Sequence, residues 1–158
     1  PNPVNTNGEL PAVGSSAPDF KLVTSDMKEI SLKDFSGKNV VLNIFPSVDT
    51  NVCATSVREF NKRAAGLANT AVVCVSKDLP FALKRFCGAE GIDKVTTATD
   101  FRGEGFSRNY GVEFIDGGFK GLCARAIVVV DGQGKVKHTE LVPQVGQEPN
   151  YDAALKAL

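Results

Sequence analysis

Two continuous apolar runs constrain the fold of this chain more than any other feature. Val40–Phe45 and Thr70–Ser76 are strand-length segments without a charged residue. A strand that shows no apolar–polar alternation is covered on both faces, which is typical of a sheet with parallel strands. The segment between the runs, 54–67, has the spacing of an amphipathic helix. The sequence therefore predicts a strand–helix–strand unit at the centre of an α/β domain.

Further elements extend this unit towards the C-terminus. Asp78 is predicted to cap a helix that Pro80 opens. Segments 125–130 and 136–141 flank an Asp-Gly turn, which predicts an antiparallel hairpin. Asn150 is expected to cap a last helix.

The N-terminal part adds shorter elements. Segment 18–23 predicts a strand, and Gly8 and Pro11 punctuate a stretch that predicts a short N-terminal β-hairpin. Together these elements predict a thioredoxin-like α/β fold, a central mixed sheet flanked by helices, as one domain over residues 1–158.

The bulk composition limits the partners of the chain. Its 158 residues are enough for one domain with a full apolar core. The 18 basic and 18 acidic residues balance, so nothing indicates binding to nucleic acid or an anionic membrane. The apolar runs are too short for a membrane helix, and four cysteines in a chain of this size indicate a reducing, cytoplasmic location. Because the chain begins with Pro1 and not Met, we expect residues upstream of it.

Cys53 lies where the first apolar run turns over into the first long helix. The amides of a first helical turn lack intrahelical partners, and the positive end of the helix dipole lies there, so an anion is stabilised over a neutral thiol. Cys53 is therefore predicted to be a reactive thiolate. The alternative is a buried cysteine that packs as a small hydrophobe, which is the interpretation we favour for Cys74 inside the second apolar run.

Three other cysteine chemistries are less compatible with the sequence. The four cysteines lie too far apart for the paired spacing of a zinc site. Thiol–disulfide exchange of the thioredoxin kind needs a Cys-x-x-Cys motif, which is absent here. A cysteine hydrolase needs a base, and the sole histidine, His138, lies in a predicted hairpin strand; this chemistry stays as an alternative. A thiolate that attacks a hydroperoxide needs no base, and it becomes a sulfenic acid.

Two residues of the turn before Cys53 fit such a site. Thr50 can place a hydroxyl beside the sulfur and the peroxide, and Pro46 fixes the backbone and shields the thiolate from water. Both could equally serve only the turn. Arg58, one helical turn beyond Cys53, is a second cation that could reach the sulfur; the alternative is a solvated ion pair with Glu59 or Asp49.

The spacing Pro46-x-x-x-Thr50-x-x-Cys53 resembles the signature of the peroxiredoxins. Four longer strings are similar to the thiol peroxidase branch, the atypical 2-Cys peroxiredoxins, and the likeness extends from about residue 14 to residue 158. The strings cover residues 43–50, 85–91, 120–126 and 148–151.

This resemblance implies roles for individual residues. Cys53 would be the peroxidatic cysteine and Cys87 the resolving cysteine of the same subunit, while Arg125 would stabilise the thiolate and the peroxide. Pro46 and Thr50 would complete the pocket. Cys123 receives no role.

The resemblance also implies the setting of the reaction. The protein would be a cytoplasmic homodimer that thioredoxin recharges, it would need no cofactor or metal, and it would favour alkyl hydroperoxides over hydrogen peroxide. The alternatives are a peroxide-sensing redox switch that signals to a partner protein, and a structural module with inert thiols. Because a disulfide holds its Cα atoms about 4.4–6.8 Å apart and packed helices lie about 8–10 Å apart, one or both of the helix ends around Cys53 and Cys87 are predicted to rearrange between the reduced and oxidised forms.

Overall fold

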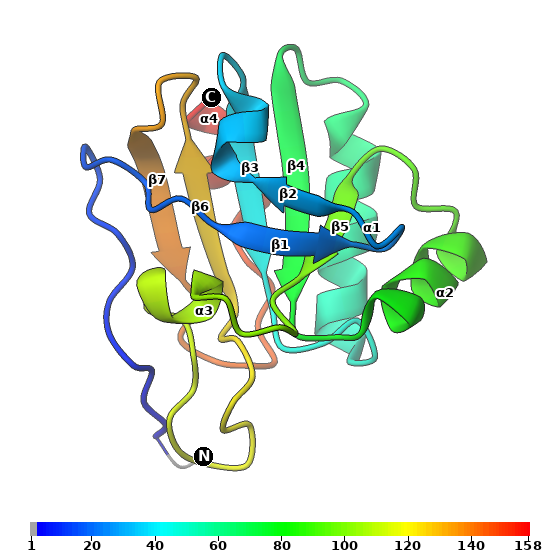
Figure 1. The fold of residues 1–158 in the computed structure, drawn as a ribbon, viewed down its shortest axis with the longest axis vertical. Helices are drawn as coiled ribbons and strands as arrows, with labels where there is room; N and C mark the ends of the chain where they lie inside the picture. The colour runs from blue at the N-terminus through cyan, green and yellow to red at the C-terminus, as the bar shows by residue number, and fades with distance from the viewer. Residues whose placement is uncertain (1–2) are drawn as a thin grey trace.

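The computed structural model describes residues 3–158 as a mixed sheet covered by helices on both faces (Figure 1). The strand order is β2-β1-β5-β4-β3-β6-β7. The elements in chain order are β1 (Lys21–Thr24), β2 (Glu29–Ser31), η1 (Leu32–Phe35), β3 (Asn39–Ile44), α1 (Asn51–Ala64), β4 (Thr70–Ser76), α2 (Pro80–Glu90), β5 (Thr96–Thr99), α3 (Phe106–Asn109), β6 (Ala126–Val130), β7 (Val136–Leu141) and α4 (Tyr151–Lys156).

The centre of the sheet is parallel, as the two apolar runs predict. Strands β3, β4 and β5 pair in parallel, whereas β6 pairs antiparallel with β3 and β7 antiparallel with β6. At the other edge, β1 pairs antiparallel with β5 and with β2. The predicted α/β architecture with a mixed sheet is therefore confirmed.

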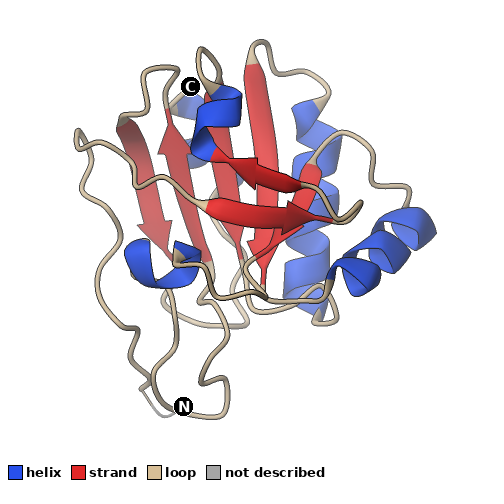
Figure 2. Cartoon of the chain, viewed as in Figure 1, coloured by secondary structure: helices blue, strands red, loops and turns tan. Residues whose placement is uncertain are grey.

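Two apolar clusters form the core, one on each face of the sheet. Figure 2 shows the helices that lie over these faces. Helices α1, α2 and α4 cover one face, and η1 and α3 cover the other. Phe60 of α1 packs edge-on against Tyr151 of α4, with ring centroids 5.2 Å apart, which attaches the last helix to the first. Among residues 3–158, no helix has both the length and the apolar composition to cross a membrane.

Local predictions differ from the structure in three places. The N-terminal hairpin is formed by β1 and β2, whereas the described segment around Gly8 and Pro11 forms no strand and is joined to the rest by the isolated bridges Thr6–Phe114 and Ser16–Lys135. Helix α1 spans 51–64 and not 54–67. Asp78 does not cap α2, because Leu79 is its N-cap residue and the Asp78 carboxylate is held by donors elsewhere.

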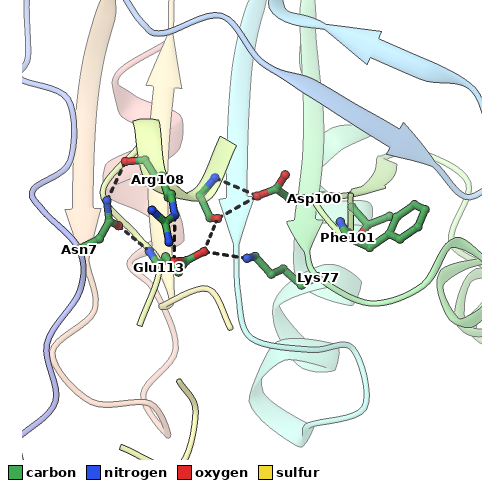
Figure 3. Close-up of polar contacts among 8 residues, drawn as sticks. Asn7, Lys77, Asp100, Phe101, Arg108 and Glu113 are labelled. Carbon is green, nitrogen blue, oxygen red and sulfur yellow. Dashed lines mark hydrogen bonds and ion pairs between the residues drawn. The ribbon is translucent and has the colours of Figure 1, made fainter. Parts of the chain in front are cut away.

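A polar network around Glu113 joins segments that are far apart in the sequence (Figure 3). The Glu113 carboxylate pairs with Lys77 at 2.9 Å and with Arg108 at 3.3 Å, and it accepts a hydrogen bond from the Ser107 hydroxyl at 3.3 Å. The Glu113 amide donates to the Asn7 side chain at 3.1 Å. The network therefore ties the N-terminal segment and α3 to the connection that follows β4.

Replacing Glu113 with Gln is expected to reduce stability at neutral pH and to have a smaller effect in acid. The hydrogen bond and charge of Lys77, with the charge of Arg108, lower the pKa of Glu113. A lowered folded pKa contributes stability above the unfolded value, about 4.3, and that contribution is lost as the pH falls through the folded pKa. Denaturant unfolding of both proteins at pH 7 and pH 3 checks this.

The exposed Glu104, changed to Gln, is the matched control and should show no such pH dependence. A stability difference between wild type and Glu113→Gln that stays constant from pH 7 to pH 3 would contradict the prediction.

Candidate active site

Cys53 lies in the first turn of α1, directly after the turn that leaves β3. Thr50 is the N-cap residue, with an extended backbone, and its carbonyl accepts the first helical hydrogen bond from Ala54 at 2.9 Å. Cys53 is thus the third helical residue, among the amides that lack intrahelical partners. Its side chain is fully buried, with 0% of its surface exposed. The helix start therefore favours a negative charge at a position that bulk water does not reach.

Arg125 contacts the Cys53 sulfur from the chain segment that leads into β6. It immediately precedes β6, and its Nη2 lies 3.3 Å from Cys53 Sγ. Nη2 and Nε also donate to the Val145 carbonyl, at 2.8 and 3.3 Å, which fixes the plane of the guanidinium. The side chain is buried, and no carboxylate pairs with it among the described residues. A buried cation held against the sulfur stabilises the thiolate over the thiol.

One nitrogen of this guanidinium remains free for a further interaction. Nη1 of Arg125 is buried and has no hydrogen-bond partner in the described part of the chain. A buried donor without a partner is unfavourable, so such an atom indicates a ligand position. The Arg125 side chain can therefore hold the sulfur with one nitrogen and a small polar molecule with another.

The turn before Cys53 is fixed by its own hydrogen bonds. Thr50 donates to the Ser47 carbonyl twice, from its hydroxyl at 3.0 Å and from its amide at 3.2 Å. Pro46 is buried at the end of β3. The Thr50 hydroxyl proton is therefore used within the turn, while its oxygen keeps lone pairs that can accept a hydrogen bond.

Cys87 lies near the end of α2 and forms no disulfide with Cys53. It is half-buried, and its sulfur lies 3.3 Å from the Thr97 hydroxyl on β5. Burial raises the pKa of the Cys87 thiol, and the hydrogen bond with Thr97 acts in the opposite direction. All four cysteines are free thiols. The contact partner of Cys87 lies on β5, whereas that of Cys53, Arg125, immediately precedes β6; β4 and β3 lie between these two strands in the sheet.

A row of polar side chains lies on the sheet between these two cysteines. Thr97, Cys74 and Asn43 are paired neighbours on β5, β4 and β3. Asn43 Nδ2 donates to Cys74 Sγ at 3.6 Å and to the Ser56 hydroxyl at 3.2 Å, and Ser56 donates to the Cys53 carbonyl at 2.7 Å.

These contacts hold the start of α1 against the sheet, and neither Asn43 nor Ser56 was predicted to belong to the site. The available signal was that Asn43 is the one polar residue in the first apolar run. A polar residue buried in a strand of this kind needs partners, so it pointed to a hydrogen-bonded contact with the covering helix.

The remaining cysteines belong to the apolar core. Cys74 and Cys123 are both fully buried, and burial raises the pKa of each thiol to about 12. The core position predicted for Cys74 is thus the one observed, although its sulfur accepts a weak hydrogen bond from Asn43.

Two alternative participants lie away from the Cys53 sulfur. Arg58 forms a two-pronged ion pair with Glu90 of α2, at 3.0 and 3.1 Å, and not with Glu59 or Asp49. His138 lies on β7 opposite Val129, whereas Arg125 precedes the start of β6. Among the described residues, the one side chain that hydrogen-bonds to the Cys53 sulfur is Arg125, so the thiol has no imidazole base.

The sequence and the fold of this chain are similar to those of known proteins. Residues 12–155 match the Redoxin family model. The chain is 61% identical over 157 residues to a thiol peroxidase from Mycobacterium tuberculosis and 55% identical to one from Corynebacterium glutamicum; each match covers 99% of this chain and 94% of the relative. Among solved structures, a peroxiredoxin-like protein from Aquifex aeolicus aligns with a TM-score of 0.92 at 41% identity, covering 99% of this chain and 91% of the other.

These matches extend over nearly the whole chain, and they include every element that surrounds Cys53 and Arg125. They also confirm the predicted thioredoxin-like fold class. The chain therefore belongs to the Redoxin family and, within it, to the thiol peroxidases, which makes it a peroxidase.

Proposed function

We propose that this protein is a thioredoxin-dependent thiol peroxidase that reduces hydroperoxides, preferably alkyl hydroperoxides, through a Cys53 sulfenic acid and a Cys53–Cys87 disulfide within one subunit. The observation that carries the proposal is the 3.3 Å contact between Arg125 Nη2 and Cys53 Sγ in a buried first helical turn. This contact stabilises a thiolate without the help of a base. Such a nucleophile suits a hydroperoxide, whose O–O bond breaks to release an alkoxide leaving group.

In the first step the Cys53 thiolate attacks the terminal oxygen of the hydroperoxide and the O–O bond breaks. The sulfur is oxidised to a sulfenic acid, and the other oxygen takes up a proton from solvent and leaves as an alcohol. The unpartnered Nη1 of Arg125 is the donor available to stabilise charge on the peroxide oxygens. The free lone pairs of the Thr50 hydroxyl can accept a hydrogen bond from the O–H group of the hydroperoxide, and buried Pro46 excludes water.

In the second step the Cys87 sulfur attacks the sulfenic acid, which forms the disulfide and releases water. Both thiols are free and have separate partners, Arg125 for the Cys53 sulfur and Thr97 for the Cys87 sulfur, so the bridge can form only when these contacts are given up. This arrangement supports a rearrangement of α2, α1 or both during turnover.

The ion pairs that join α2 to α1 and to the turn before Cys53 are compatible with such a movement. Arg58–Glu90 and Arg85–Asp49 are exposed ion pairs that join α2 to α1 and to the turn. Exposed pairs contribute about 0–1 kcal/mol each, so breaking them adds little to the free energy of opening. Gly91, which ends α2 in the left-handed conformation with φ 65°, gives the chain a natural point at which to unwind.

The resemblance to thiol peroxidases supports the remaining parts of the proposal. We infer that thioredoxin reduces the disulfide and that the protein works as a cytoplasmic homodimer. Steady-state consumption of cumene hydroperoxide with a thioredoxin system tests this activity. Repeated turnover supports the enzyme, whereas consumption of one equivalent per protein would indicate the alternative, a peroxide-sensing switch that signals to a partner protein.

Replacing Cys53 with Ser is expected to abolish peroxide consumption, because the hydroxyl of Ser cannot supply the thiolate nucleophile. Replacing Cys87 with Ser should leave one fast oxidation and no thioredoxin-coupled cycling, because the sulfenic acid then has no resolving thiol. Stopped-flow and coupled assays measure both. Full cycling by Cys87→Ser, or undiminished activity of Cys53→Ser, would contradict the assignment.

Replacing Arg125 with Gln is expected to slow the oxidation of Cys53 by about 10²–10³, the usual effect of removing a donor to developing charge. Arg125→Lys keeps the charge without the planar fork and should fall between wild type and Gln. Arg58→Gln is the matched control, since its guanidinium binds Glu90 and not the sulfur. Equal losses in the Arg58 and Arg125 variants would contradict the role given to Arg125.

Iodoacetamide at pH 8 is expected to label Cys53 and Cys87 of the folded, reduced protein and to leave Cys74 and Cys123 unlabelled. Burial raises the pKa of each of these two thiols to about 12, so both stay protonated at that pH. Peptide mass spectrometry assigns the labelled positions, and the protein in guanidinium chloride serves as the control in which all four react. Labelling of Cys74 or Cys123 as fast as Cys87 in the folded protein would refute this division.

A further inference from the structure

We propose that Asp78 is a positioning residue for the oxidation of Cys53, because its carboxylate anchors the turn that carries Pro46 and Thr50; this inference rests on the proposed function. Asp78 lies in the connection between β4 and α2, outside the peroxiredoxin-like spacing that contains Cys53. It does not contact the Cys53 sulfur, so it acts through the turn.

The carboxylate of Asp78 accepts hydrogen bonds from the turn before Cys53 and from the end of β4. Oδ1 accepts from the Ser47 hydroxyl at 2.7 Å, and Oδ2 accepts from the Val48 amide at 2.9 Å. On its own side of the site, Oδ2 also accepts from the Ser76 hydroxyl at 2.6 Å. Hydrogen bonds to an ionised acceptor are about twice as strong as neutral ones, so these contacts hold the turn firmly against the end of β4.

Ser47 passes this anchoring on to Thr50. While its hydroxyl donates to Asp78, the same oxygen accepts from the Asp49 amide at 3.1 Å. The Ser47 carbonyl accepts both the amide and the hydroxyl of Thr50. Thr50 in turn caps α1, the helix that holds Cys53. The position of Asp78 therefore fixes the Thr50 hydroxyl and the start of the helix through Ser47.

The point of attachment of Asp78 is itself fixed from a second side. The preceding residue, Lys77, pairs with Glu113 at 2.9 Å in the network shown in Figure 3. Residues 76–78 are thus held by the Cys53 turn and by the Glu113 network, immediately before α2 begins. The carboxylate can keep the turn in place while the helix that carries Cys87 rearranges beyond it.

Attack on a peroxide depends on this placement more than simple alkylation does. The O–O bond must lie in line with the sulfur and within reach of Arg125 and Thr50, and a misplacement of about 1 Å can reduce such a rate by about 10². Alkylation by iodoacetamide needs only the thiolate and access to it. Comparing the two reactions at Cys53 therefore separates loss of alignment from loss of the thiolate or of folding.

The test measures both reactions on the reduced full chain, by rapid quench and mass spectrometry of the Cys53 peptide. In Asp78→Ala, oxidation by cumene hydroperoxide is expected to be about 10–100-fold slower, and alkylation no more than about 3-fold slower. Asp78→Asn keeps the shape and one acceptor oxygen, so it should recover part of the loss. Equal slowing of both reactions, or unchanged oxidation, would overturn the proposal.

A matched pair of serine variants tests the same point without changing Asp78. Ser47→Ala and Ser76→Ala each remove one hydroxyl from this carboxylate, but only Ser47 belongs to the Cys53 turn. Oxidation is expected to be about 3–10-fold slower in Ser47→Ala, and less affected in Ser76→Ala even if that variant is less stable. Equal rates in the two variants would count against the proposal if Asp78→Ala does not fold.

Failure of this inference is distinguishable from failure of the proposed function. If cumene hydroperoxide does not oxidise Cys53 of the wild-type protein, the proposed function is wrong. If the wild-type protein is oxidised rapidly and the Asp78 and Ser47 variants are oxidised equally fast, the positioning role alone is wrong.

Discussion

The contact between the Arg125 guanidinium and the Cys53 sulfur is the interaction on which the rest of the site depends. Both side chains are buried, at 2% and 0% exposure, so neither charge is hydrated by bulk water. A buried charge without a partner is strongly unfavourable, and no carboxylate neutralises Arg125 among the described residues. In the proposed function, a thiolate at Cys53 is the negative partner of this buried guanidinium.

The topology of the sheet brings this pair together from positions 72 residues apart. Because β3 and β6 are antiparallel, the end of β3 lies beside the start of β6, with Ile44 opposite Ala126. The chain leaving β3 enters the turn and α1, and Arg125 immediately precedes β6. The two central features of the site therefore follow from one strand pairing, and the Val145 carbonyl then sets the direction of the guanidinium.

Local sequence patterns predicted the helices and strands better than the tertiary contacts of individual side chains. The apolar run Thr70–Ser76 became β4 with the same bounds, because burial on both faces leaves a strong signal in the sequence. The capping role predicted for Asp78 was wrong, since Ser47 and Val48, some thirty residues earlier, offer donors that a local pattern does not show. Arg58 likewise pairs with Glu90 of another helix. The turn at Cys53 was recognisable from local chemistry, whereas Asn43, Ser56 and Asp78 act through tertiary contacts.

The Cys53 turn and helix α2 are held by different kinds of polar contact. This difference fits the proposed cycle, in which Cys53 stays in place for the attack on the peroxide and Cys87 then reaches it. The turn and the start of α1 are fixed by partly or fully buried hydrogen bonds, from Asp78 on one side and from Asn43 through Ser56 on the other. Helix α2 is joined to the same region by exposed ion pairs, which are weaker. Helix α2 also buries Leu83 and Phe86 in the apolar cluster that contains Cys53, so a movement of the whole helix would expose them. For the proposed disulfide step we therefore expect movement at the Cys87 end of α2 more than at the Cys53 turn, so that the geometry for peroxide attack survives each cycle.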